Sequence, residues 1–162
     1  MADVYAFLDL EGIPGESQDS EYSEKIELQS FSWGASNNSS YAVGTGSGIG
    51  KGQIHDISCS KFTDKASLKL MERAVNGKPI SSGTLTLLKM SGETKVAFLK
   101  LKMTDIVCTS FQVAAGADGH LPMESLTLHF VKVESSYQPQ GNEGDPSGNI
   151  DFGWDLQQNV AA

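Results

Sequence analysis

Short stretches in which apolar and polar residues alternate dominate this chain and predict β-strands. The clearest spans residues 4–10, where Val4, Ala6, Leu8 and Leu10 fall on one side. Further strands are expected over residues 25–35, 53–61, 83–90, 95–103, 106–114, 123–137 and 150–156. In the strand over 25–35, the two-residue period places Ser30 and Ser32 on the side opposite Phe31 and Trp33.

One stretch, from Lys65 to Val75, has the period of a helix. Its apolar residues Ala66, Leu70, Met71, Ala74 and Val75 recur at the spacing of one helix face. Asp64 is placed to cap its start, and Gly77 before Pro79 to end it. Many strands with one helix predict a mainly β single domain over residues 1–162, a sandwich or barrel with a small helical cap.

The segment 37–52 is unusually rich in glycine, with five of the 17 glycines of the chain. A loop of this length inside a compact domain is usually functional or disordered. It does not match a phosphate-binding loop, because Thr45 replaces the first glycine and Gly52 replaces the hydroxyl residue that holds the metal. The segment does not match a dinucleotide-binding fingerprint either, because Ile49 stands where the third glycine is required. We therefore expect no nucleotide cofactor.

Charge narrows the range of partners. The formal net charge is -8 and the sequence pI is about 4.7, so the surface repels phosphate backbones and nucleic acid is not expected to bind. The N-terminus has no basic stretch, and Asp3 and Asp9 interrupt its apolar residues, unlike a secretory signal. No apolar run approaches the ~18 residues of a membrane span. We expect folding in the cytoplasm and no membrane insertion.

Catalytic and metal-binding patterns are absent from the sequence. His55, His120 and His129 are isolated from one another, and His129 is expected to line a face or to be a satisfied interior residue. Cys59 and Cys108 form no CxxC pair, so two buried thiols are expected, although a disulfide stays open. The sequence predicts a protein that is not an enzyme and carries no metal or other cofactor.

Several distinctive blocks follow one another along most of the chain. They are Gly12-Ile-Pro-Gly15-Glu16-Ser17, Ser30-Phe-Ser-Trp33-Gly34, the glycine-rich segment, Asp56-Ile-Ser58-Cys-Ser-Lys61-Phe-Thr-Asp64-Lys65, Tyr137-Gln-Pro139-Gln140 and Gly153-Trp154-Asp155-Leu-Gln-Gln-Asn159. In their order and spacing between positions 4 and 159, these blocks resemble the Hcp family, the tube proteins of type VI secretion. The resemblance implies a β-barrel of two packed antiparallel sheets, with one α-helix and an extended glycine-rich loop.

The same resemblance implies a structural function. Family members form homohexameric rings that stack into a hollow tube, with a contractile sheath, a spike, a baseplate and effector proteins as partners. It also implies secretion through that machine without a signal peptide, after a cytoplasmic stage. Some members carry a C-terminal toxin domain, which we do not expect here.

Two sets of residues are candidates for contacts in such a tube. We hypothesise that the glycine-rich loop reaches a neighbouring ring through Asn37, Tyr41, Val43, Gly46, Gly48 and Ile49, the competing interpretation being a merely disordered hairpin. We also hypothesise that Ser30 and Ser32 face the lumen and contact effectors. The rival interpretation is that Phe31 and Trp33 form the exposed pair.

Two other functions stay open at this point. A tail-tube protein of a contractile phage shares the architecture, and genomic neighbours distinguish it. A monomeric β-barrel that binds a ligand in its own interior is the alternative of a different class. It predicts a species near 17 kDa in solution, whereas a tube subunit predicts a particle of ring size.

Overall fold

The structure is a computed structural model that describes residues 4–37, 52–139 and 148–162. The described strands are β1 (Val4–Leu10), β2 (Ile26–Leu28), β3 (Ser30–Ser32), β4 (Ala35–Ser36), β5 (Gln53–Ile54), β6 (Ile57–Phe62), β7 (Ile80–Ser91), β8 (Thr94–Ala114), β9 (Met123–Tyr137), β10 (Ile150–Asp155) and β11 (Val160–Ala161), with helix α1 (Ser67–Asn76) between β6 and β7. This arrangement confirms the predicted fold class, mainly β with antiparallel sheets and one helix.

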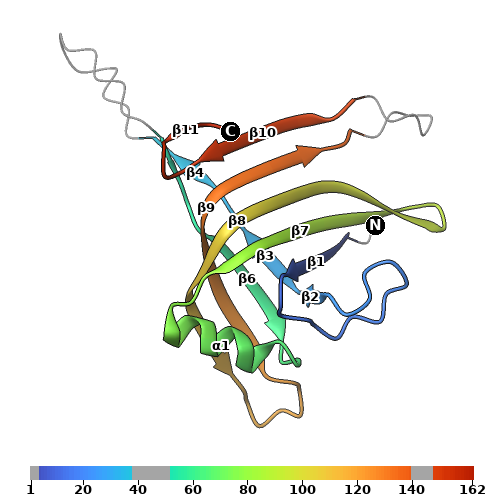
Figure 1. The fold of residues 1–162 in the computed structure, drawn as a ribbon. Helices are drawn as coiled ribbons and strands as arrows, with labels where there is room; N and C mark the ends of the chain where they lie inside the picture. Colours follow the sequence, from blue (N-terminus) through green and yellow to red (C-terminus); the bar gives the residue numbers. More distant parts are fainter. Residues whose placement is uncertain (1–3, 38–51, 140–147) are drawn as a thin grey trace.

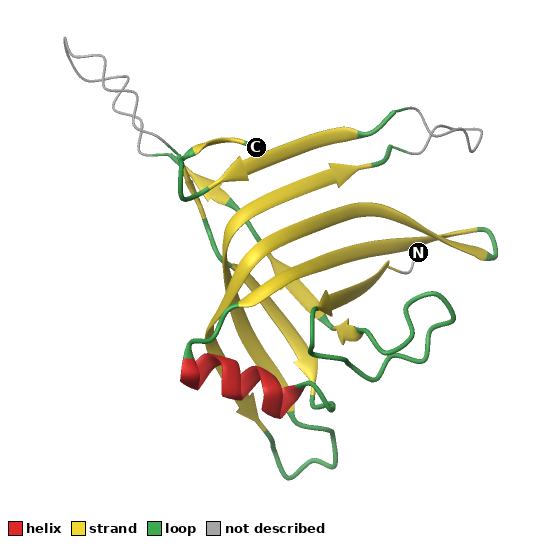
Figure 2. Ribbon diagram, in the orientation of Figure 1, coloured by secondary structure: helices red, strands yellow, loops and turns green. Residues whose placement is uncertain are grey.

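The sheet closes on itself as a barrel (Figures 1 and 2). The order of neighbouring strands is β2-β1-β7-β8-β9-β6-β3, and every pair is antiparallel. Only Gln29 separates β2 from β3, so a single extended segment pairs first with β1 and then with β6, which completes the circuit. The strand expected over 25–35 is therefore divided into β2, β3 and β4. Beyond the barrel, β10 and β11 extend the sheet from the second half of β9.

Strands β8 and β9 run through both walls of this barrel and curve between them (Figure 1). The strands expected over 95–103 and 106–114 are in fact the single strand β8. At the change of direction, Asp105 has a φ of 53°, and the buried positions shift from Leu101 and Met103 to Ile106 and Cys108. The register with β7 and β9 is unbroken across Asp105, and the register shift with β9 comes only between Cys108 and Ser110. The change of alternation at Asp105 therefore marks a bend within one continuous strand.

The core lies inside the barrel and consists of apolar side chains from all of its walls. Its fully buried members include Ile26, Ile57, Leu70, Leu101, Met103, Ile106, Leu126, Leu128 and Val133. Gly83 sits where β7 passes close to this core, because a Cβ there would lie 2.6 Å from Leu10 Cδ2 and 2.8 Å from Ile106 Cδ1. A larger residue at this position would force these two core side chains to move.

Helix α1 covers one end of the barrel. Leu70 and Ala66 are buried, as predicted, and Gly77 ends the helix with a φ of 66°. The prediction was wrong for Val75 and Met71, which are exposed at 84% and 37%, because the helix presents only a narrow face to the barrel. The helix begins at Ser67, later than expected, so Asp64 does not flank it directly, although its carboxylate accepts the Ala66 backbone N–H at 2.9 Å.

A buried ionic cluster holds the start of this helix against β6 and β9. Lys61 is completely buried, and its ammonium lies 2.6 Å from Glu124 and 2.7 Å from Asp64. Ser67 donates to the Glu124 carboxylate at 2.9 Å, and Thr63 donates to its second oxygen at 2.9 Å. All of these charges have partners, which is the condition for tolerating them in an apolar interior.

Within the ranges that the structure describes, α1 is the one α-helix, and it is too short and too polar to cross a membrane.

Candidate functional site

Ser30 and Ser32 lie on the outside of the barrel wall. Both are exposed in β3, whereas Phe31 between them and Trp33 after them pack against the core. The alternation predicted from the sequence is thus present, and the serines rather than the aromatic residues face away from the core. The Ser30 hydroxyl forms a hydrogen bond with the Ser60 hydroxyl on the adjacent strand β6.

These serines are part of a wider surface without charge. Strand register aligns Ser30 with Ser60, Ser125 and Gln112, and it aligns Ser32 with Ser58, Thr127 and Ser110. Residues opposite one another in adjacent strands share a face of the sheet. We call this group the neutral polar strip: Ser30, Ser32, Ser58, Ser60, Ser110, Gln112, Ser125 and Thr127. It crosses four strands of a chain that carries 20% charged residues.

Sequence reasoning identified only the part of the strip on β3. The signal for the rest is a polar-apolar-polar triplet that recurs on each strand, as Ser58-Cys-Ser60, Ser110-Phe-Gln112 and Ser125-Leu-Thr127. One triplet alone cannot be distinguished from any half-buried strand. Only the register shows that the four triplets are adjacent.

A hydrogen-bonded histidine–aspartate pair marks one end of the strip. His129 on β9 lies 2.7 Å from Asp56, through its Nδ1 and a carboxylate oxygen, and the Thr109 hydroxyl donates to the other oxygen at 3.4 Å. His129 therefore lines a face, one of the two positions expected for it. His55, beside Asp56 in sequence, forms its hydrogen bond with Ser36 instead, at 2.9 Å. No group of three metal-ligating side chains gathers within the described ranges.

Two strand edges beside the strip have open hydrogen-bonding groups. From Val107 to Ala114, β8 pairs only with β9 among the described residues, and β3 pairs only with β6. An edge of this kind presents unpaired N–H and C=O groups that readily bind another strand. The two edges lie at opposite margins of the same four-stranded wall, β8-β9-β6-β3.

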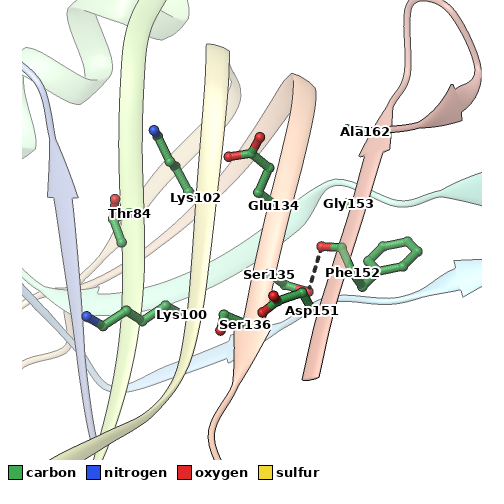
Figure 3. Close-up of a pocket in the computed structure, with 10 residues that line it drawn as sticks. All are labelled: Thr84, Lys100, Lys102, Glu134, Ser135, Ser136, Asp151, Phe152, Gly153 and Ala162. Carbon is green, nitrogen blue, oxygen red and sulfur yellow. Dashed lines mark hydrogen bonds between the residues drawn. The ribbon is translucent and has the colours of Figure 1, made fainter. Parts of the chain in front are cut away.

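A separate shallow pocket of about 660 Å³ lies on the outer face of β7 to β10 (Figure 3). Lys100 and Lys102 project from β8 across from Glu134 on β9 and Asp151 on β10. Ser135 donates to the Phe152 backbone carbonyl at 3.3 Å. The hydrogen bond from Lys132 keeps the pKa of Glu134 below its usual value. The two lysines and the two carboxylates of this pocket carry opposite charges, so the pocket does not present charge of one sign to a ligand.

Both cysteines are free thiols that point into the core, which resolves the alternative left open by the sequence. Burial raises the pKa of Cys59 to about 12 and also raises the pKa of Cys108. Because the thiolate is the reactive form, neither residue is placed to act as a nucleophile near neutral pH.

Most of the predicted stacking loop lies outside the described residues, namely Tyr41, Val43, Gly46, Gly48 and Ile49. Asn37 is described and exposed. It directly follows β4, which pairs with β5 in a short antiparallel ladder through Ala35–Ile54 and Ser36–Gln53. The two ends of the glycine-rich segment are therefore held together at its base.

Comparisons with known proteins agree over nearly the whole chain. Residues 7–137 match the sequence model of a family described as "Type VI secretion system effector, Hcp". The curated protein hcp1 of Pseudomonas aeruginosa is 32% identical over 160 residues, which cover 98% of this chain and 99% of the relative.

Solved structures give the same result for the fold. A structure described as that of a type six secretion system protein has a TM-score of 0.91 and 29% identity, and covers 99% of this chain and 100% of its own. Hcp1 from Salmonella typhimurium has a TM-score of 0.79 at 26% identity, with both chains covered completely.

Proposed function

This chain belongs to the Hcp family of type VI secretion proteins, and we infer from this that it is a subunit of the secretion tube, forming hexameric rings that stack. The observation that carries this conclusion is the match of residues 7–137 to the family, together with a TM-score of 0.91 over nearly the full chain. The role is structural and not catalytic. The shallow, charge-balanced pocket and the protonated cysteines support that assignment.

The ring is built by joining the open strand edges of neighbouring protomers. The edge of β8 over Val107–Ala114 in one protomer meets the edge of β3 in the next, and the four-stranded walls become one continuous sheet around the lumen. A closed ring requires contacts between two different patches, and these edges lie at opposite margins of the wall.

The neutral polar strip forms the lumen face of this sheet, with Ser30 and Ser32 in contact with effectors. Short hydroxyl side chains offer hydrogen bonds without fixed charge. A passenger protein therefore makes contacts that hold it in the ring yet release it easily, because no ion pair has to be broken. The core-facing positions of Phe31 and Trp33 support this orientation.

The remaining partners follow from the tube. The glycine-rich loop from Asn37 to Gly52 reaches the next ring from its base at β4 and β5. The contractile sheath, spike and baseplate act on the assembled tube. The chain folds in the cytoplasm before firing and then leaves through the machine, and it binds neither nucleic acid nor membrane.

Native mass spectrometry and negative-stain microscopy test the assembly. Six copies of the 17.3 kDa chain predict a ring of about 104 kDa with a central hole. A solution that contains only the 17.3 kDa species at high protein concentration would refute the tube and favour the monomeric barrel.

Effector contact is tested by Ser32→Gln, which enlarges one position of the strip. We expect intact rings with reduced retention of a co-expressed effector, measured by co-purification. Ser136→Gln is the matched control, since Ser136 lies on the other wall, next to the pocket of Figure 3. Equal retention in the two variants would contradict the lumen assignment.

A further inference from the structure

The outer face of α1 is both apolar and basic, in a chain with a net charge of -8. Leu68 and Val75 are 77% and 84% exposed, and Met71 is also exposed. We define the α1 outer face as Leu68, Lys69, Met71, Arg73, Val75 and, just after the helix, Lys78. Glu72 is the one carboxylate of this helix, so the face has an excess of positive charge.

The three cations of this face have no ionic partner in the part of the chain that the structure describes. Arg73 donates only to the Pro79 backbone carbonyl, at 3.0 Å, and neither Lys69 nor Lys78 takes part in an ion pair. In contrast, Lys65, which precedes the helix, has an acidic neighbour in the same chain, because its ammonium lies 3.8 Å from a carboxylate oxygen of Glu24. Arg73 lies six residues beyond Ser67, the first residue of α1, and therefore about 9 Å along the helix at 1.5 Å per residue.

The β1–β2 connection carries an acidic surface that lies beside the segment leading into α1, near Asp64 and Lys65 and away from the C-terminal end of the helix (Figure 1). Its charges fall into two groups. Asp9, Asp19 and Glu24 have partners in Lys25, Lys95 and Lys65. The others have no ionic partner among the described residues. Of these, Glu11 accepts hydrogen bonds from Ser81 and Ser82, and we call the remaining three the acidic loop face: Glu16, Glu21 and Glu27.

We propose that the α1 outer face of one protomer docks on the acidic loop face of the next protomer in the ring. The proposal rests on the ring assembly described above and names a second contact within it. Helix α1 packs on β8, and the acidic loop face leads into β2 and hence β3. Each surface therefore flanks one of the two open edges, and joining the edges brings the surfaces together.

The two surfaces suit each other chemically. Cations and carboxylates that lack partners within one chain gain them between chains, which aligns the protomers and disfavours wrong contacts. Leu68 and Val75 supply apolar area that is otherwise left in water. The contact is heterologous, as a closed ring requires.

Charge reversal on either surface tests the proposal. We expect Lys69→Glu with Arg73→Glu to raise the protein concentration needed for half-assembly by at least about tenfold, because like charges then face each other. Glu16→Lys with Glu21→Lys should have the same effect. Circular dichroism melts check that both variants remain folded.

Mixing the two reversed proteins gives the decisive measurement. In a ring that alternates between them, every contact again joins opposite charges, so the mixture should form hexamers where each protein alone does not. A mixture that stays monomeric while both proteins are folded would overturn the proposal.

Other outcomes separate this inference from the proposed function. If either reversed protein assembles at the concentration of the unmodified chain, the α1 contact is refuted while the tube assignment stands. If the unmodified chain forms no rings, both fail. The α1 variant could also assemble normally but melt at a lower temperature. This result would show that Arg73 acts only within its own helix, because cations stabilise the C-terminal end of a helix. It would also refute the docking.

Discussion

The buried ionic cluster gives the sharpest prediction about stability. In Lys61→Met, a side chain of similar length replaces the one cation that the described residues place near Glu124, which is 1% exposed. The Glu124 carboxylate keeps the hydroxyl donors of Thr63 and Ser67 but loses the ammonium at 2.6 Å. Removing one partner of a buried pair costs about 3–5 kcal/mol.

That loss is large enough to measure directly. For a chain of this size, each kcal/mol lowers the melting temperature by about 2–4 °C, so a decrease of roughly 6–20 °C is expected. Urea unfolding at one fixed protein concentration gives the free energy, and the fixed concentration matters because assembly adds to apparent stability.

The double variant Lys61→Met with Glu124→Met provides the control. Replacing both partners of a buried pair by apolar residues is often close to neutral, so the second substitution should restore part of the stability lost by the first. The coupling between the two positions follows from the four free energies. A loss below about 1 kcal/mol in the single variant, or further destabilisation in the double variant, would refute the conclusion that pairing holds these charges in the interior.

Two further predictions concern titration and thiol chemistry. The hydrogen bond from Lys95 holds the pKa of Asp19 below its usual value, so this contact stabilises the fold above about pH 4 and is lost as the pH falls through the lowered pKa. Lys95→Met should therefore lower the melting temperature more at pH 7 than at pH 2, and an equal decrease at both would contradict this. Because the pKa of Cys59 is raised to about 12, a thiol reagent at pH 8 should label it slowly in the native protein and rapidly in urea, and fast native labelling would contradict its burial.

Local patterns in the sequence predicted many elements correctly. The bounds of β1 and β9 match the expected ranges, because each strand keeps one face toward the core for most of its length. The helix was placed to within two residues, since Gly77 ends it by adopting a left-handed conformation. The prediction divided β8 in two because the alternation changes at Asp105. A change of alternation looks the same in a sequence whether a strand ends or bends.

The sequence by itself determined which residues can form strands, which side of β3 is polar and where the single helix lies, because these properties depend on neighbours a few positions away. Only the tertiary structure decided that four separate polar triplets form one uncharged strip, that Lys61 is buried, and that Val75 is exposed. These properties depend on which strands pair and in what register. The two-residue alternation of a strand shows which face of the sheet each side chain takes, but it does not show which strand pairs with it or in what register.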